Sequence, residues 1–242
     1  MKNKSVERDV LKTAYNRILA HDIHNASTEE QLAYLTENFE NIVFSSSFSY
    51  EDQMITHLLK DLDVKIFTLD TGRLFPETYE TWNLTLSRFG ISINTYYPET
   101  ERLEAFVTQK GPDSFYKSVE DRKNCCYIRK VEPLNRALKG QQVWITGLRS
   151  EHSPDRQNLS SFEWDEQRGI IKYHPLLNRK TAEVVDYIKK NSIPYNKLHD
   201  KGYISIGCAP CTRALRNGED FRAGRWWWED QSKKECGLHI KQ

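Results

Sequence analysis

The stretch that decides the fold is NIVFSSSFSYEDQMITHLL, residues 41–59. Its first part, NIVFSSSF, is typical of a short buried strand that runs into a serine-rich loop. The apolar side chains that follow recur at the 3.6-residue spacing of a helix; they are Met54, Ile55, Leu58 and Leu59. We therefore expect a strand, a loop and a helix in this order.

Three further segments predict strands: VKIFTLD (residues 64–70), ISINTYY (91–97) and QVWITGL (142–148). Strands that alternate with helices indicate the α/β class, with a mostly parallel sheet covered by helices on both faces. Ligands bind at the carboxyl ends of such strands. The loops SSSFSYED, LDTGR and ITGLRSEHSPDR each follow a predicted strand, so we expect them to meet at one edge.

Local signals place the helices. Ser27 and Glu30 have the spacing of a capping box, Pro76 can start a helix and Gly90 can end it. Thr181 is placed to cap a later helix, and another is expected over about 124–138. From Arg213 onward the periodicity fades into Gly, Arg and Trp. We therefore expect an α/β domain over residues 1–212 and a C-terminal arm over 213–242.

The composition narrows the class of function. The chain has 242 residues, and 35 basic against 34 acidic side chains give a net charge of +1. This balance gives no electrostatic reason to expect nucleic-acid or membrane-surface binding. No run of about 18 apolar residues predicts a membrane span, and the N-terminus lacks the apolar stretch of a secretory signal. We expect a cytoplasmic protein, and the sequence leaves open whether it is a homo-oligomer.

The five cysteines divide into four and one. Cys125 and Cys126 are adjacent, Cys208 and Cys211 form a C-x-x-C pair, and Cys236 stands alone near the C-terminus. Disulfide frameworks are rare in cytoplasmic proteins, so the division predicts a metal centre and a separate reactive thiol. Zinc is one alternative, and four buried cysteines without a metal are another. Adjacent cysteines favour an iron–sulfur cluster, in which two thiolates can reach different irons.

Two other segments have a functional and a plainer interpretation. The serines and backbone N–H groups of residues 45–52 could form an anion cradle at a helix N-terminus, or a simple turn in which Ser49 or Asp52 caps the helix. The loop alone favours the turn, and it is neither a Walker A loop nor a G-x-G-x-x-G motif. The lone Cys236 is either incidental or a nucleophile that Lys233, Lys234 and His239 activate.

Basic residues gather near the paired cysteines. Arg129 and Lys130 follow Cys126 by three and four residues, and Arg222 and Arg225 precede three consecutive tryptophans. Clustered arginines suggest binding of phosphate or sulfate. We interpret the tryptophans as packing that docks the arm rather than as a base-stacking platform.

The chain resembles the assimilatory adenylyl-sulfate (APS) reductases of the sulfonucleotide reductase family. The resemblance extends from about Ile42 to His239, and its motifs are SFSYED, LDTGRLFPETY, CCYIRKVEPL, ITGLRSEHSPDR, KLHDKGYISIGCAPCTRAL and GRWWWEDQSKKECGLH. It implies a Rossmann-like fold of the adenine nucleotide alpha-hydrolase type. It also implies a 4Fe-4S cluster on Cys125, Cys126, Cys208 and Cys211, with Cys236 as nucleophile.

The resemblance further implies that the substrate is a sulfonucleotide reduced to sulfite and AMP, in sulfate assimilation and cysteine biosynthesis. Cys236 would carry an S-sulfocysteine intermediate, and thioredoxin, or a glutaredoxin-like protein, would supply electrons. The implied substrate-binding residues are Ser47, Ser49, Leu69, Arg73, Lys130, Gly147, Arg149, Arg222, Arg225 and His239.

Substrate choice and rival functions stay open at this point. Related loops often carry glycine where this chain has Tyr50, so the Tyr50 ring must point away from the phosphate or the loop must differ. Intact cluster cysteines favour APS over 3′-phospho-APS (PAPS), and a PAPS or dual reductase is the alternative. An ATP pyrophosphatase of the same fold would need an SGGxDS-type loop, and a non-catalytic metal module would leave Cys236 without a purpose.

Overall fold

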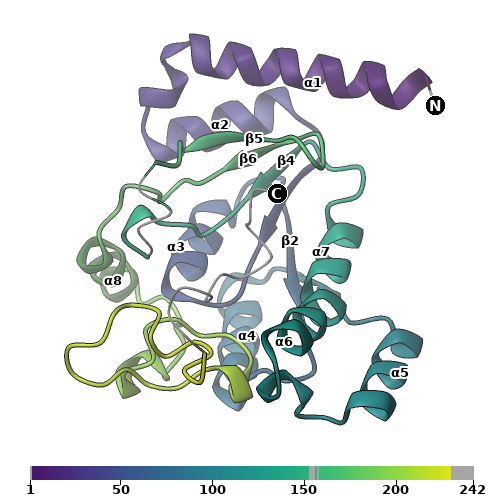
Figure 1. Cartoon of the computed structure of the whole chain (residues 1–242). Helices are drawn as coiled ribbons and strands as arrows, with labels where there is room; N and C mark the ends of the chain where they lie inside the picture. The colour runs from purple at the N-terminus through teal and green to yellow at the C-terminus, as the bar shows by residue number, and fades with distance from the viewer. Residues whose placement is uncertain (1, 153–155, 157, 230–242) are drawn as a thin grey trace. The chain divides into compact units, whose positions relative to one another are not determined.

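The computed structural model describes residues 2–152, 156 and 158–229 (Figure 1). The chain divides into two compact units. Unit 1 takes in residues 1–67, 84–93 and 140–195, and unit 2 takes in 68–83, 94–139 and 196–242. Cys236 and His239 lie outside the described residues, as does the part of the predicted arm from residue 230 onward. The predicted boundary at residue 212 therefore stays a prediction.

A six-stranded sheet forms the framework, with strand order β3-β2-β1-β4-β6-β5. The strands are β1 (Ile42–Ser45), β2 (Lys65–Leu69), β3 (Asn94–Tyr96), β4 (Val143–Ile145), β5 (Phe162–Asp165) and β6 (Ile170–Tyr173). Strands β2, β1, β4 and β6 pair in parallel, and β5 runs antiparallel to β6. The predicted α/β class with a mostly parallel sheet is thus confirmed.

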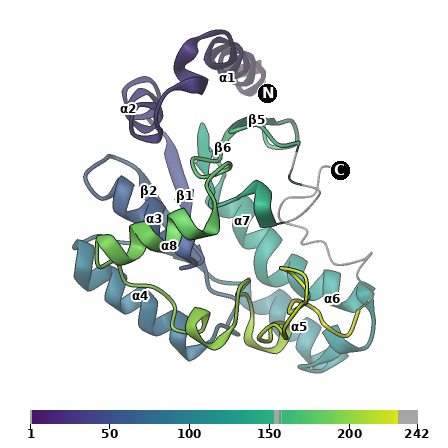
Figure 2. The same ribbon diagram turned by 90° about the vertical axis from the view of Figure 1, so that its left-hand side faces the viewer.

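The core of unit 1 comes from the central strands and the helices that pack on them. Strands β1 and β4 are almost wholly buried, which explains why their sequences are apolar runs without alternation. Helix α1 (Lys2–Ala20) packs on β5 and β6, and helix α3 (Tyr50–Leu59) packs on α8 (Thr181–Lys190), as Figures 1 and 2 show. Helix α2 (Thr28–Asn38) begins at the predicted capping box.

Unit 2 carries the helix that bears the adjacent cysteines. Helix α6 (Val119–Cys126) continues through a π-helical turn (Tyr127–Val131) into α7 (Glu132–Ala137). This helix therefore begins earlier than the predicted 124–138, because Ser118 caps it by accepting a hydrogen bond from the Asp121 N–H at 3.0 Å. Helices α4 (Pro76–Phe89) and α5 (Thr100–Lys110) complete the helical elements named here.

Three elements were not predicted from the sequence, and the cap of one helix was predicted at the wrong residue. Helix α1, helix α5 and the β5–β6 hairpin were not predicted. Thr181 is the first residue of α8 rather than its cap, because the extended backbone that precedes the helix belongs to Lys180. No helix among the described residues is both long and apolar enough to cross a membrane.

Candidate active site

The four paired cysteines come together in unit 2. Cys125 and Cys126 end helix α6, whereas Cys208 and Cys211 flank a 3₁₀ turn. All four are free thiols and line one pocket, whose other walls are Arg73, Phe115, Arg122, Arg129, Lys130 and Pro210. Within the described part of the chain, no three His, Cys, Asp or Glu side chains are grouped so that they could hold a single metal ion.

The pocket is basic as well as cysteine-rich. Arg129 lies in the π-helical turn and hydrogen-bonds to Cys125, four residues before it, and Arg129 Nη1 also donates to the Thr71 carbonyl at 2.6 Å. The Arg73 guanidinium lies 5.1 Å from the centre of the Phe115 ring. π-Helical turns are frequent at functional sites because they shift side chains relative to a regular helix. The predicted association of Arg129 and Lys130 with the cysteines is therefore confirmed, with Cys125 as the partner of Arg129.

The charges act differently on the thiols. Burial opposes ionisation of Cys208, but Lys130, the Thr71 hydroxyl, Arg225 and Arg129 together lower its pKa. The Thr71 Oγ1 lies 3.3 Å from Cys208 Sγ. Burial, followed by the charge of Cys208, raises the pKa of Cys211 to about 12. Positive charge around buried sulfur atoms lowers the cost of holding thiolates there.

Several buried N–H groups beside the cysteines lack a hydrogen-bond acceptor among the described residues. They are Arg129 Nε, Arg225 Nε and Trp226 Nε1. Trp226 packs with Cys208, Cys211 and Phe115 in one buried cluster, and its side chain is 1% exposed. Buried donors without acceptors are rare in folded proteins, so these groups indicate an acceptor that the described residues do not supply. The donor set therefore fits an anionic, sulfur-rich group held by the four cysteines.

Two of the three tryptophans pack as predicted, whereas the Trp227 side chain is 38% exposed. Trp226 is buried, and the Trp228 ring lies 4.4 Å from the centre of Tyr116 and 6.1 Å from that of Phe115. The Arg222 and Arg225 guanidinium groups lie 5.7 Å and 5.0 Å from the centre of the Trp226 ring. The Arg225 guanidinium lies so close to Gly207 that a Cβ at residue 207 would be 2.3 Å from Arg225 Nη2. Only glycine at residue 207 leaves room for this guanidinium.

The serine loop of unit 1 is organised by a buried carboxylate. Asp52 Oδ2 accepts hydrogen bonds from the Ser47 N–H at 2.6 Å and the Ser47 hydroxyl at 2.7 Å. Ser49 caps helix α3, as the plainer interpretation predicted, and accepts from the Asp52 N–H at 3.4 Å. Burial raises the pKa of Asp52 to about 6, although the Ser47 hydrogen bonds oppose this shift. The loop is therefore a fixed turn built around Asp52.

Gly147 faces the same carboxylate. A Cβ at residue 147 would lie 2.2 Å from Asp52 Oδ1 and 3.2 Å from the Glu51 Cβ. Real Cβ atoms essentially never show a contact as short as 2.2 Å, and a contact of 3.2 Å is tight. The structure thus brings the predicted residues Ser47, Ser49 and Gly147 together around Asp52. A side chain at residue 147 would clash with Asp52, which explains the glycine.

Arg149 is buried in a polar network of unit 1. Its Nε donates to Glu51 at 2.8 Å, Nη1 to Glu151 at 2.6 Å and to the Arg179 carbonyl at 3.0 Å, and Nη2 to the Thr181 hydroxyl at 2.8 Å and to His152. A guanidinium has five N–H donors, and each has a protein acceptor here. The predicted substrate-binding role of Arg149 stays a prediction. The contacts of Arg149 connect the loop after β4 to helix α3.

Burial opposes the charge of Glu51, but the hydrogen bond and charge of His152 and the charge of Arg149 lower its pKa to about 2. Burial in turn lowers the pKa of His152. At neutral pH, Arg149 is therefore the partner that keeps Glu51 ionised.

The sequence left open whether the Tyr50 ring turns away from the loop or the loop backbone differs. Its ring stacks on Tyr195, with the ring centres 5.2 Å apart. The neighbouring Phe48 is buried and has a φ of 61°, a backbone conformation that bulky residues rarely adopt. The loop therefore departs from a regular backbone at Phe48, while Tyr50 packs against the protein.

The remaining predicted residues that the structure describes all belong to unit 2. Unit 2 holds Leu69, at the end of β2, together with Arg73, Lys130, Arg222 and Arg225. Sequence reasoning missed Asp52 as the organiser of the loop, Arg122 and Glu229. Each acts through a partner that the local sequence does not reveal.

Comparison with known proteins fits this arrangement. Residues 41–214 match the model of the phosphoadenosine phosphosulfate reductase domain. The chain belongs to this family. An adenosine 5′-phosphosulfate reductase of Burkholderia cepacia is 49% identical over 86% of this chain and 84% of its own length. A relative of the same name from Allochromatium vinosum is 46% identical over 90% and 86%.

A solved structure supports the same relationship. The phosphoadenylyl-sulfate (PAPS) reductase of Candida auris, in a phosphate complex, is 30% identical and covers 82% of this chain and 96% of its own, with a TM-score of 0.70. The fold of this reductase family is therefore the fold described above, and the resemblance inferred from the motifs is confirmed.

Proposed function

We propose that this chain reduces adenylyl sulfate to sulfite and AMP, as an oxidoreductase of sulfate assimilation and cysteine biosynthesis. The observation that carries the proposal is the pocket in which Cys125, Cys126, Cys208 and Cys211 meet basic side chains, in a chain about half identical to proteins named adenosine 5′-phosphosulfate reductase. The reaction belongs in the cytoplasm, where the free thiols of these cysteines persist.

The cofactor we propose is a 4Fe-4S cluster on the four cysteines. The basic walls and the acceptor-free N–H groups of Arg129, Arg225 and Trp226 support an anionic sulfur-rich group. When bound, such a cluster supplies negative charge and polarisation beside Lys130, while the electrons of the net reaction come from a dithiol. Lys130 and Arg225, whose charges act on Cys208 and Cys211, are the cations that we propose for binding the sulfonucleotide.

The nucleophile we propose is Cys236. Its thiolate attacks the sulfur of the sulfate group, the S–S bond forms, and the S–O bond to the phosphate breaks as AMP leaves with the electron pair. The enzyme then carries an S-sulfocysteine. A thiolate of thioredoxin attacks Cys236 Sγ, sulfite leaves with the electron pair, and the second thioredoxin cysteine resolves the mixed disulfide. Two electrons thus pass from the dithiol to the substrate sulfur.

We propose that the nucleotide binds at the serine loop, which Asp52 organises, and at the loop after β4, which carries Arg149. Ser47, Ser49, Leu69, Gly147 and Arg149 are the residues we propose for the adenosine side, and Arg73, Lys130, Arg222, Arg225 and His239 for the phosphosulfate. APS is preferred to PAPS in this proposal, because the four cysteines are intact. A dual APS and PAPS reductase is the second candidate, supported by the family match to a PAPS reductase domain.

The test is a coupled assay of the anaerobically purified protein with thioredoxin and either APS or PAPS. We expect sulfite and AMP in equal amounts from APS, slower release from PAPS, and none from Cys236→Ser. A brown protein with about four irons per chain is expected from the four thiolate ligands. Sulfite release by Cys236→Ser would contradict the nucleophile, and a colourless zinc protein would contradict the cluster.

A further inference from the structure

The turn over residues 225–229 lies directly against the cysteine centre of unit 2. Trp226 has a φ of 43°, in the left-handed region that bulky residues avoid. Its N–H donates to the Cys211 carbonyl at 3.2 Å, and its carbonyl accepts from the Glu229 N–H at 2.9 Å. A strained backbone of this kind persists only where the surroundings hold it.

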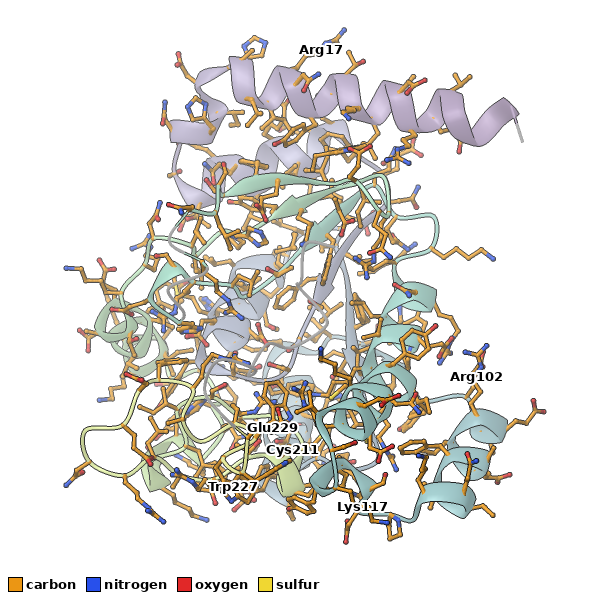
Figure 3. The ribbon with its side chains drawn as sticks, in the orientation of Figure 1. Arg17, Arg102, Lys117, Cys211, Trp227 and Glu229 are labelled. Atoms are coloured by element: carbon orange, nitrogen blue, oxygen red, sulfur yellow. The ribbon has the colours of Figure 1, made fainter. Side chains whose placement is uncertain are left out.

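A buried ion pair holds this turn to helix α6. Arg122 Nε donates to Glu229 Oε1 at 3.0 Å and Arg122 Nη2 to Oε2 at 2.8 Å, and the two side chains are 1% and 4% exposed. The Arg122 guanidinium also lies 4.5 Å from the centre of the Trp226 ring. Arg122 stands three residues before Cys125 on the same helix. Figure 3 labels Glu229 next to Cys211, from the other cysteine pair.

The pair is better suited to fix geometry than to add stability. Burying two charges costs much of the attraction between them, so an apolar pair of similar volume often stabilises a protein as well. A bidentate Arg–carboxylate contact, in contrast, fixes both the distance and the orientation of its partners. Glu229 is also the last described residue before Cys236. The seven residues from Glu229 to Cys236 span at most about 25 Å when fully extended, so this turn limits where the thiol can reach.

We propose that Arg122 and Glu229 are positioning residues that set the direction in which the chain leaves the cysteine centre toward Cys236. The proposal rests on the proposed function of Cys236 as nucleophile. We assign neither residue a direct role in the chemistry. They act through the turn at Trp226, which ties the Cys125 helix and the Cys211 carbonyl to Glu229, the last described residue before Cys236.

The experiment measures single-turnover formation of the sulfo adduct on the anaerobically purified protein at saturating APS, without reductant. Glu229→Gln keeps the size of the side chain and removes its charge. The double variant Arg122→Met/Glu229→Met removes both charges, so that no unpaired charge is buried if the single variant fails to fold. Glu219→Gln is the matched control, since Glu219 makes a bidentate pair with Arg213, at 2.7 Å for both contacts, in the same unit.

We expect both the single and the double variant to form the adduct about 10- to 100-fold more slowly than the wild type, with iron content and AMP affinity at the wild-type level. Glu219→Gln is expected to match the wild type. An unchanged adduct rate overturns the proposal, and so does a loss of rate in step with iron content and AMP affinity, which would make the pair merely structural. Failure of the wild type to form any adduct contradicts the proposed function instead.

Discussion

At the scale of single residues, Asp52 is the side chain that organises the serine loop of unit 1. It holds the Ser47 N–H and hydroxyl, and Gly147 exists to leave it room. Its sequence position suggested only a helix cap. The opposing glycine became visible because β1 and β4 are neighbours in the sheet.

The first prediction concerns the pH dependence of stability in Asp52→Asn. Burial raises the pKa of Asp52 from 3.8 to about 6 in the folded state. A raised pKa means that the folded protein binds the proton more tightly, so this stabilisation is complete below about pH 4 and is lost as pH rises through about 6. Urea unfolding of both proteins from pH 4 to 8 should therefore show the variant gaining stability relative to the wild type between pH 4 and 6. A difference that does not vary with pH would argue against a buried, proton-linked Asp52.

The second prediction concerns Gly147→Ala. The new methyl group would meet Asp52 Oδ1 at 2.2 Å, so the loop must shift, and overpacking of this kind costs about 1–3 kcal/mol. AMP affinity, measured by calorimetry, should fall with stability. The double variant Gly147→Ala/Asp52→Ala removes the clashing carboxylate and should lose less than the sum of the single changes. Strict additivity would show that the two positions do not interact.

At the scale of elements, helix α6 connects local sequence to the cysteine centre. Ser118 caps the helix, Cys125 and Cys126 end it, and Arg129, in the π-helical turn that follows, hydrogen-bonds to Cys125. The sequence predicts a helix here from its periodicity. A π-helical turn leaves no clear mark in that periodicity, since it adds one residue to a single turn and the helix continues on either side.

The third prediction concerns the cap of α6. Ser118→Ala removes the acceptor of the Asp121 N–H and should cost about 1 kcal/mol, and it should also speed loss of iron because the frayed helix carries two cysteines. Ser27→Ala is the control, as Ser27 caps α2 in unit 1 by accepting from the Glu30 N–H. It should lose similar stability but keep its iron. Equal iron loss in both variants would mean that the cap acts only through global stability.

At the scale of the whole molecule, the sequence predicted the α/β class, the strands β1, β2, β3 and β4, and the family. These follow from buried apolar runs and from motifs that are continuous in the chain. The β5–β6 hairpin escaped because its strands are short and carry charged residues, and the turn depends on Gly169 at a φ of 67°.

Long-range pairs escaped for a different reason. Arg149 and Glu51 are 98 residues apart, and Arg122 and Glu229 are 107 apart. Arginine and glutamate are common surface residues, and nothing in their local sequence distinguishes a buried partner. Such pairs become visible only when the fold brings them together.

The central claim, that Cys236 is the nucleophile of an APS reductase, is tested most directly by intact mass and peptide mapping after incubation with APS alone. Without a reductant, the proposed reaction stops at the enzyme intermediate. We predict one sulfo group per chain, located on Cys236 and removed by thioredoxin, and none on Cys236→Ser. An adduct on another residue, or sulfite formation without any adduct, would contradict the account.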